Sequence, residues 1–167
     1  MRYYLLVRLA ILTASFACIS HGKQIWAESY IGKKAPDLVV EKWLGVKPET
    51  TDKFLLIDFW ATWCGPCRRA IPELNEIHRR LGERVTVIGI SDETEEAVKK
   101  MKEPKIDYSI AIDPKARMKN KLRVKGIPHV ILVDPSGVVR WEGFPLLESD
   151  PLTLKVVSDI VVSYSRK

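Results

Sequence analysis

The stretch Phe59-Trp60-Ala61-Thr62-Trp63-Cys64-Gly65-Pro66-Cys67 decides the fold of this chain. An apolar run from Phe54 to Trp60 leads into it, and apolar residues at helical spacing follow it. Two cysteines that open a helix lie at its unpaired N–H groups and at the positive end of its dipole. A thiol in that position ionises more easily, and the thiolate is its reactive form. We therefore expect a redox site at Cys64 and Cys67.

Strands and helices alternate around this stretch. The continuous apolar run 54–60 is typical of a central strand buried on both faces, and apolar residues three and four apart predict a helix over 64–81, with Pro72 inside it. Further strands are expected at 85–90, 109–112, 130–133 and 138–141, and further helices at 114–122 and 151–163. This order predicts an α/β fold, a three-layer α/β/α sandwich with a mixed central sheet.

The charged residues after the second strand predict one more short helix. Ser91 or Asp92 is expected to cap it, and Glu93 stands in its first turn. Lysines follow at positions 99, 100 and 102, so the order of charges suits the helix dipole.

The composition is that of an ordinary globular protein, with 46% hydrophobic and 29% charged residues among 167. The formal net charge is +6, but basic residues are interspersed with acidic ones. No basic face with interleaved aromatic residues is recognisable, so we expect no binding to nucleic acid.

The N-terminal residues have the pattern of a signal peptide. Arg2 and Arg8 precede an apolar, almost uncharged stretch over residues 9–20, and small residues allow cleavage after Gly22. Two alternatives stay open, an uncleaved membrane anchor and a lipoprotein with its lipid on Cys18. We expect export to the periplasm or another extracytoplasmic location, with residues 1–22 as signal or anchor.

The remaining chain divides into a polar linker over residues 23–34 and a single domain over 35–167. Cleavage would remove Cys18 and leave one close cysteine pair. A secreted domain stapled by disulfides carries more cysteines than that, so the pair serves chemistry rather than scaffolding.

Several motifs together resemble the thioredoxin superfamily. Residues Trp63 to Cys67 match its active-site sequence, Pro72 stands at the matching helix position, and residues 124–128 resemble its cis-proline loop. The signal-like N-terminus, the lead-in over residues 32–37 and an extra helix-strand segment from Glu93 to Ile112 resemble the TlpA/ResA-like extracytoplasmic branch. The resemblance implies a thioredoxin-like sandwich with a helix-strand insertion, and thiol–disulfide oxidoreductase activity.

The two cysteines are expected to have different roles. Cys64 precedes the helix, so its sulfur should be exposed and attack as a thiolate. Cys67 lies one turn in, should be more buried, and should resolve the mixed disulfide. In the family, the intervening Gly65 and Pro66 go with a reducing rather than an oxidising pair.

Asp58 interrupts the apolar strand six residues before Cys64. A buried, unpaired carboxyl has a raised pKa and can take the proton of Cys67 as that thiol attacks. The alternative is an acid at the surface end of a strand. Thioredoxins often hold a lysine on the next strand near this acid, and the matching position here is Gly89.

The resemblance implies that the loop at Pro128 presents backbone groups of Ile127 to a substrate strand. Trp63, Gly65 and Pro66 complete the expected substrate-binding surface. His129 either tunes the site near neutral pH or is a buried polar side chain. We expect no cofactor and no metal, because no second Cys-X-X-Cys pair accompanies the first.

The expected function is reduction of disulfides in partner proteins outside the cytoplasm, by a monomer. The resemblance implies clients in cytochrome c biogenesis or copper-site assembly, and a membrane electron donor of the CcdA/DsbD type. Two alternatives stay open. A peroxiredoxin-like thiol peroxidase shares the Ala-Pro-Asp lead-in but not Gly-Pro between cysteines, and a thioredoxin-fold binding module would carry the pair incidentally.

Overall fold

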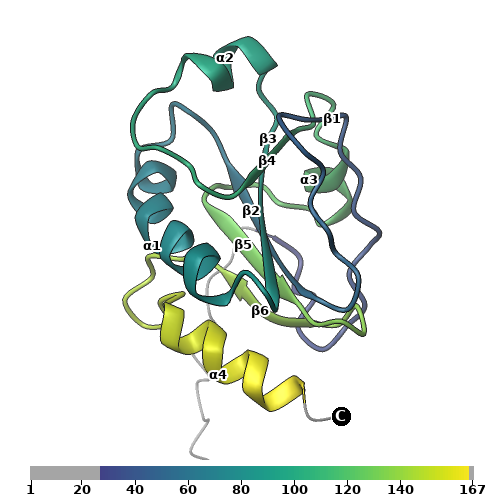
Figure 1. Ribbon diagram of the computed structural model, residues 1–167. Coiled ribbons are helices and arrows are strands. Elements are labelled where there is room, and N and C mark those ends of the chain that lie inside the picture. Colours follow the sequence, from purple (N-terminus) through teal and green to yellow (C-terminus); the bar gives the residue numbers. More distant parts are fainter. Residues whose placement is uncertain (1–26, 166–167) are drawn as a thin grey trace, which may run out of the picture.

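A computed structural model describes residues 27–165 and contains a six-stranded mixed sheet (Figure 1). The strands, in their order across the sheet, are β1 (Lys42–Trp43), β4 (Ser109–Ile112), β3 (Val85–Ser91), β2 (Phe54–Trp60), β5 (His129–Val133) and β6 (Val139–Gly143). β2 runs parallel to β3 and antiparallel to β5. β4 is parallel to β3, whereas β1 and β6 are antiparallel to their neighbours. The predicted mixed sheet is confirmed.

Two long helices cover one face of the sheet. α1 (Gly65–Leu81) and α4 (Leu154–Tyr164) lie side by side there (Figure 1). Between them and the strands is a cluster of buried apolar side chains from all three elements, including Leu56, Val87, Ile71, Leu74, Ile77, Val157 and Val161. The helix predicted from residue 64 therefore forms, and it continues through Pro72.

The opposite face is covered by α3 (Arg117–Lys121) and by the segment before β1. Ile57 and Phe59 of β2 point to this side, whereas Leu56 points to α1, because successive side chains of a strand alternate between faces. β2 is thus buried on both faces, as predicted, and the three-layer arrangement is confirmed. α3 is shorter than the predicted helix over 114–122, since Ala116 takes a left-handed conformation with φ of 50°.

The predicted insertion between β3 and β4 is present and contains α2 (Glu95–Lys100). The predicted cap is wrong: Thr94 caps α2, and its hydroxyl accepts a hydrogen bond from the N–H of Ala97 at 3.3 Å. Glu93 therefore lies before the helix, where its carboxylate is available to another part of the chain.

Part of the segment predicted as a linker packs on the sheet. Ile31 and Lys34 form bridges beside β6, and the N–H of Tyr30 donates to the Glu142 carboxylate at 2.8 Å. The hydroxyl of Ser29 donates to the same carboxylate, which is buried. The predicted signal segment 1–22, with Cys18, lies outside the described residues. Within 27–165, no helix has both the length and the apolar character needed to cross a membrane.

Replacing Glu142 tests this attachment. Glu142→Ala removes the acceptor for Ser29 and Tyr30, so the free energy of unfolding is expected to fall by about 1–3 kcal/mol. Limited proteolysis should also cut residues 27–34 faster. The control is Glu148→Ala, at an exposed acid in the segment that follows β6. Equal stability and equal cleavage in the two variants would contradict the attachment.

Candidate active site

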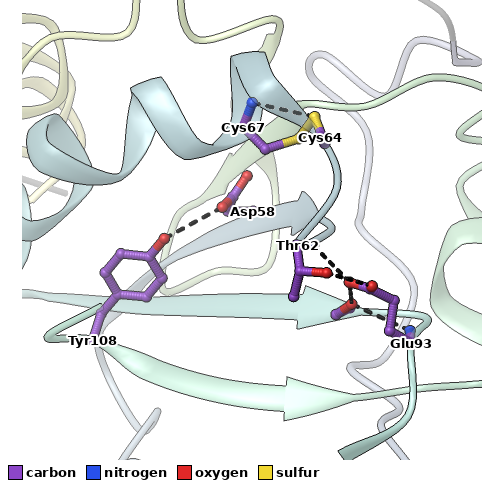
Figure 2. The surroundings of a disulfide bond; sticks show 7 residues. Asp58, Thr62, Cys64, Cys67, Glu93 and Tyr108 are labelled. Atoms are coloured by element: carbon purple, nitrogen blue, oxygen red, sulfur yellow. Dashed lines mark hydrogen bonds between the residues drawn. A yellow bond between two sulfur atoms is a disulfide. The ribbon is translucent and has the colours of Figure 1, made fainter. Parts of the chain in front are cut away.

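Cys64 and Cys67 form a disulfide at the N-terminus of α1, with 5.3 Å between their Cα atoms (Figure 2). Cys64 is the residue that caps the helix, and its Sγ accepts a hydrogen bond from the N–H of Cys67 at 3.2 Å. Pro66 occupies the first helical turn, where a missing N–H costs nothing. The pair thus lies at the unpaired N–H groups of the helix, as the sequence predicts.

The expectation that the Cys64 sulfur is exposed is wrong for this disulfide-bonded form. Cys64 is 4% exposed and Cys67 only 1%, so the predicted order of burial holds while the exposure does not. Both pack in an apolar cluster with Trp60, Ala61, Val98 and Ile112. The residues next to the two cysteines are exposed instead: Trp63 is 73% exposed, and Gly65 and Pro66 are exposed too.

Asp58 is buried in the middle of β2, so the alternative of a surface acid is wrong. Burial raises the pKa of its carboxyl to about 7, and a hydrogen bond from the Tyr108 hydroxyl at 3.4 Å acts in the opposite direction. In Figure 2 the Asp58 side chain lies between Tyr108 and the first turn of α1 with Cys67. The site therefore combines a disulfide-bonded cysteine pair with a carboxyl that can hold or release a proton near neutral pH.

A second carboxylate, Glu93, fixes the loop before Cys64. It accepts hydrogen bonds from the N–H of Thr62 at 2.6 Å and from the Thr62 hydroxyl at 2.7 Å (Figure 2). The Ser91 hydroxyl donates to it as well, at 3.1 Å. Sequence reasoning missed this role, because it assigned Glu93 to a helix and nothing in the spacing links it to Thr62.

The loop before β5 closes the site from another side. The peptide bond between Ile127 and Pro128 is cis, as the resemblance implies, and Ile127 packs against the cluster that holds both cysteines. His129 is 1% exposed, and its ring lies 6.3 Å from the ring of Phe59. Its burial favours the interpretation as a core polar side chain. Within residues 27–165, no group of three His, Cys, Asp or Glu is arranged to hold a metal ion.

Comparison with known proteins gives the family. The model of the AhpC/TSA family matches residues 31–142, which include the cysteine pair, Asp58 and the Pro128 loop. The chain belongs to the AhpC/TSA family.

Curated relatives are named for one chemistry. Thiol-disulfide oxidoreductase ResA of Bacillus thuringiensis subsp. konkukian is 36% identical over 118 residues, which are 67% of this chain and 68% of that protein. The chain thus spans about two thirds of that relative's length. The protein of the same name from Geobacillus kaustophilus is 28% identical over 149 residues, 81% of this chain and 84% of that protein.

Solved structures agree in fold. The thioredoxin domain of a thiol-disulfide oxidoreductase from Bacteroides vulgatus has a TM-score of 0.65 and 26% identity, over 78% of this chain and 97% of that one. A thiol:disulfide interchange protein from Bacteroides sp. has a TM-score of 0.57 and 30% identity, over 69% and 77%. The predicted thioredoxin-like fold is confirmed, as is the class of thiol–disulfide oxidoreductase.

Replacing Asp58 tests its burial. The pKa of about 7 in the folded protein lies above the value of about 3.9 in an unfolded chain, so the folded state binds the proton more tightly. Stability from this group is complete below about pH 4 and is lost as the pH rises through 7. Asp58→Asn should therefore stabilise the oxidised protein by about 3 kcal/mol more at pH 8 than at pH 5, measured by denaturant unfolding. An equal change in the free energy of unfolding on Asp58→Asn at pH 5 and at pH 8 would show that Asp58 is not buried as described.

Replacing Glu93 tests the loop attachment. Glu93→Ala leaves two polar groups of Thr62 without their acceptor, so the free energy of unfolding should fall by about 1–3 kcal/mol. The matched control is Glu96→Ala, which removes an exposed i,i+4 pair with Lys100 and should cost less than about 0.5 kcal/mol. Indistinguishable losses from the two variants would argue against the attachment.

Proposed function

We propose that this chain reduces disulfide bonds of partner proteins outside the cytoplasm, with Cys64 as the attacking and Cys67 as the resolving thiol. One observation carries the proposal: a closed Cys-X-X-Cys disulfide at a helix N-terminus beside a buried carboxyl with a pKa near neutral. The signal-peptide pattern of residues 1–22 supports the location.

The first step begins from the reduced pair. The Cys64 thiol gives its proton to solvent, and the helix N-terminus stabilises the thiolate. The thiolate attacks one sulfur of the client disulfide. A bond forms between Cys64 Sγ and that sulfur, the client's own S–S bond breaks, and one client thiolate leaves.

The second step releases the client. Asp58 takes the proton of the Cys67 thiol, and the Cys67 thiolate attacks Cys64 Sγ. The bond between Cys64 and the client breaks, the second client thiolate leaves, and the disulfide seen in the structure forms. Two electrons have passed from the chain's dithiol to the client's disulfide.

Client binding is assigned to the surface around the pair. The exposed Trp63, Gly65 and Pro66 offer contact area next to the sulfur atoms, and the loop of Ile127 and Pro128 offers backbone groups to an extended client segment. Each turnover consumes one dithiol equivalent, so a dithiol donor must reduce the pair again. A membrane donor of the CcdA/DsbD type, and clients from cytochrome c biogenesis or copper-site assembly, are what the family resemblance implies.

Cysteine variants test the mechanism in an insulin-reduction assay with dithiothreitol as donor. Cys64→Ser should abolish catalysis, because no thiol remains to attack. Cys67→Ser should stop turnover and accumulate a mixed disulfide on Cys64, visible by non-reducing electrophoresis and mass spectrometry. The matched control Cys18→Ser should reduce insulin at the unchanged rate.

The outcomes separate the three functions. Full activity of Cys64→Ser would overturn the mechanism. Consumption of hydrogen peroxide by the unaltered chain, without insulin reduction, would favour the thiol peroxidase. Binding of client without either activity would favour the binding module.

The direction of the reaction has its own test. Equilibration with glutathione buffers gives the potential of the pair, and a reductase should be more negative than the oxidant DsbA, at about −120 mV. A value as high as that of DsbA would contradict the reducing direction.

A further inference from the structure

We propose that Tyr108 is the positioning residue for Asp58: its hydroxyl holds one carboxyl oxygen, the other oxygen is left for the proton of Cys67, and Gly89 provides the space that the tyrosine ring needs. The inference rests on the proton-accepting role of Asp58 in the proposed function and names the residues on which that role depends.

The first support is the arrangement of the two side chains. Tyr108 is 4% exposed, and its hydroxyl donates to Asp58 Oδ2 at 3.4 Å. Asp58 Oδ1 is buried and has no hydrogen-bond partner among residues 27–165. Figure 2 shows the carboxyl with one oxygen toward Tyr108 and the other on the side of α1 and Cys67. A buried acceptor without a partner, next to a thiol that must lose a proton, is placed to take that proton.

The second support is the missing side chain at Gly89. Gly89 of β3 is the register partner of Asp58. A Cβ at this position would lie 3.0 Å from Cε2 of Tyr108 and 2.9 Å from Nε1 of Trp60, closer than such atoms pack. Any larger residue would therefore push the tyrosine ring or the indole aside. Glycine at this position admits the ring, which comes from the insertion immediately before β4.

The third support is the absence of charge around Asp58. Its sheet neighbours are Gly89 on β3 and Val130 on β5, and no charged side chain contributes to its raised pKa within the described part of the chain. α1 brings Cys67 to this side, and His129 is the register partner of Phe59, whose ring lies in the cluster on the opposite face. The pKa of Tyr108 is raised well above 10 by burial and by Asp58, so its hydroxyl stays protonated and remains a donor.

A neutral donor in this place has a chemical consequence. A cation beside Asp58 would favour the charged carboxylate and weaken it as a base. A hydroxyl orients the carboxyl while leaving its pKa near neutral, where it can both accept a proton from Cys67 and return it to solvent.

The resolving step can be measured alone. Reduced protein is mixed with excess hydroxyethyl disulfide, and oxidation is followed by the change in tryptophan fluorescence. At saturating disulfide the first-order rate reports attack of Cys67 on the mixed disulfide, whereas the dependence on disulfide concentration reports attack of Cys64. The rates are recorded between about pH 5 and pH 9, a range that brackets the carboxyl's titration.

Tyr108→Phe removes the hydroxyl and keeps the ring. In the pH profile of the first-order rate of the resolving step, the midpoint should move upward by about 0.5–1 pH unit. The reason is that the charged carboxylate of Asp58 loses one hydrogen bond. The second-order rate of Cys64 should not change. Tyr30→Phe is the matched control, since the Tyr30 hydroxyl donates to Lys121 O instead, and it should move neither rate.

Gly89→Ala should move the pH midpoint of the resolving rate upward by a similar amount. The double variant Gly89→Ala, Tyr108→Phe should shift this midpoint no further than either single variant, because both substitutions act through one contact. A midpoint unchanged in Tyr108→Phe, while Asp58→Asn flattens the profile, would overturn the inference and leave the proposed function intact. An unaltered profile in Asp58→Asn would remove the proton-accepting role itself, and with it this inference. The cysteine variants above test the proposed function separately, because they remove the reacting thiols and leave the contact between Tyr108 and Asp58 in place.

Discussion

The site depends on one carboxyl group held where a charge is costly. Asp58 is the single acid in a seven-residue strand that is otherwise apolar, and among the described residues its carboxyl is hydrogen-bonded only to the neutral hydroxyl of Tyr108. Desolvation raises its pKa to about 7, so that both the protonated and the ionised carboxyl are populated near neutral pH. The strand that carries it leads through the short loop of residues 61–63 to the cysteine pair at the start of α1.

Three parts of the chain contact the residues at and after the end of β2. α1 places Cys64 and Cys67 at its N-terminal N–H groups, Glu93 secures Thr62 in the intervening loop, and the insertion delivers Tyr108 to the Asp58 carboxyl. The last two contacts join residues that are far apart in the sequence. The helix-strand insertion thus contacts both the loop before the cysteine pair and the Asp58 carboxyl, and is not only an addition to the fold.

The elements around the pair could be predicted because their signals are local. The apolar run of β2, the helical spacing after Cys64 and the acid that interrupts the strand all lie within about 30 residues. The role of Glu93 could not be predicted, since Thr62 lies 31 residues before it and the predicted caps, Ser91 or Asp92, placed Glu93 in the first turn of the helix. The contact of Tyr108 with Asp58 needs the sheet register and the empty space at Gly89, which no single-strand pattern reveals. The burial of Cys64 follows from its packing against Trp60 and Ala61, which depends on the folded sheet end.

The most direct test of the account is the titration of Asp58 itself. In the oxidised protein the two cysteines cannot titrate, so the carbon-13 shift of the Asp58 carboxyl, assigned by its loss in Asp58→Asn, reports this group alone. The account predicts a midpoint near pH 7. A midpoint near the ordinary value of an exposed aspartate, at about 3.9, would contradict it.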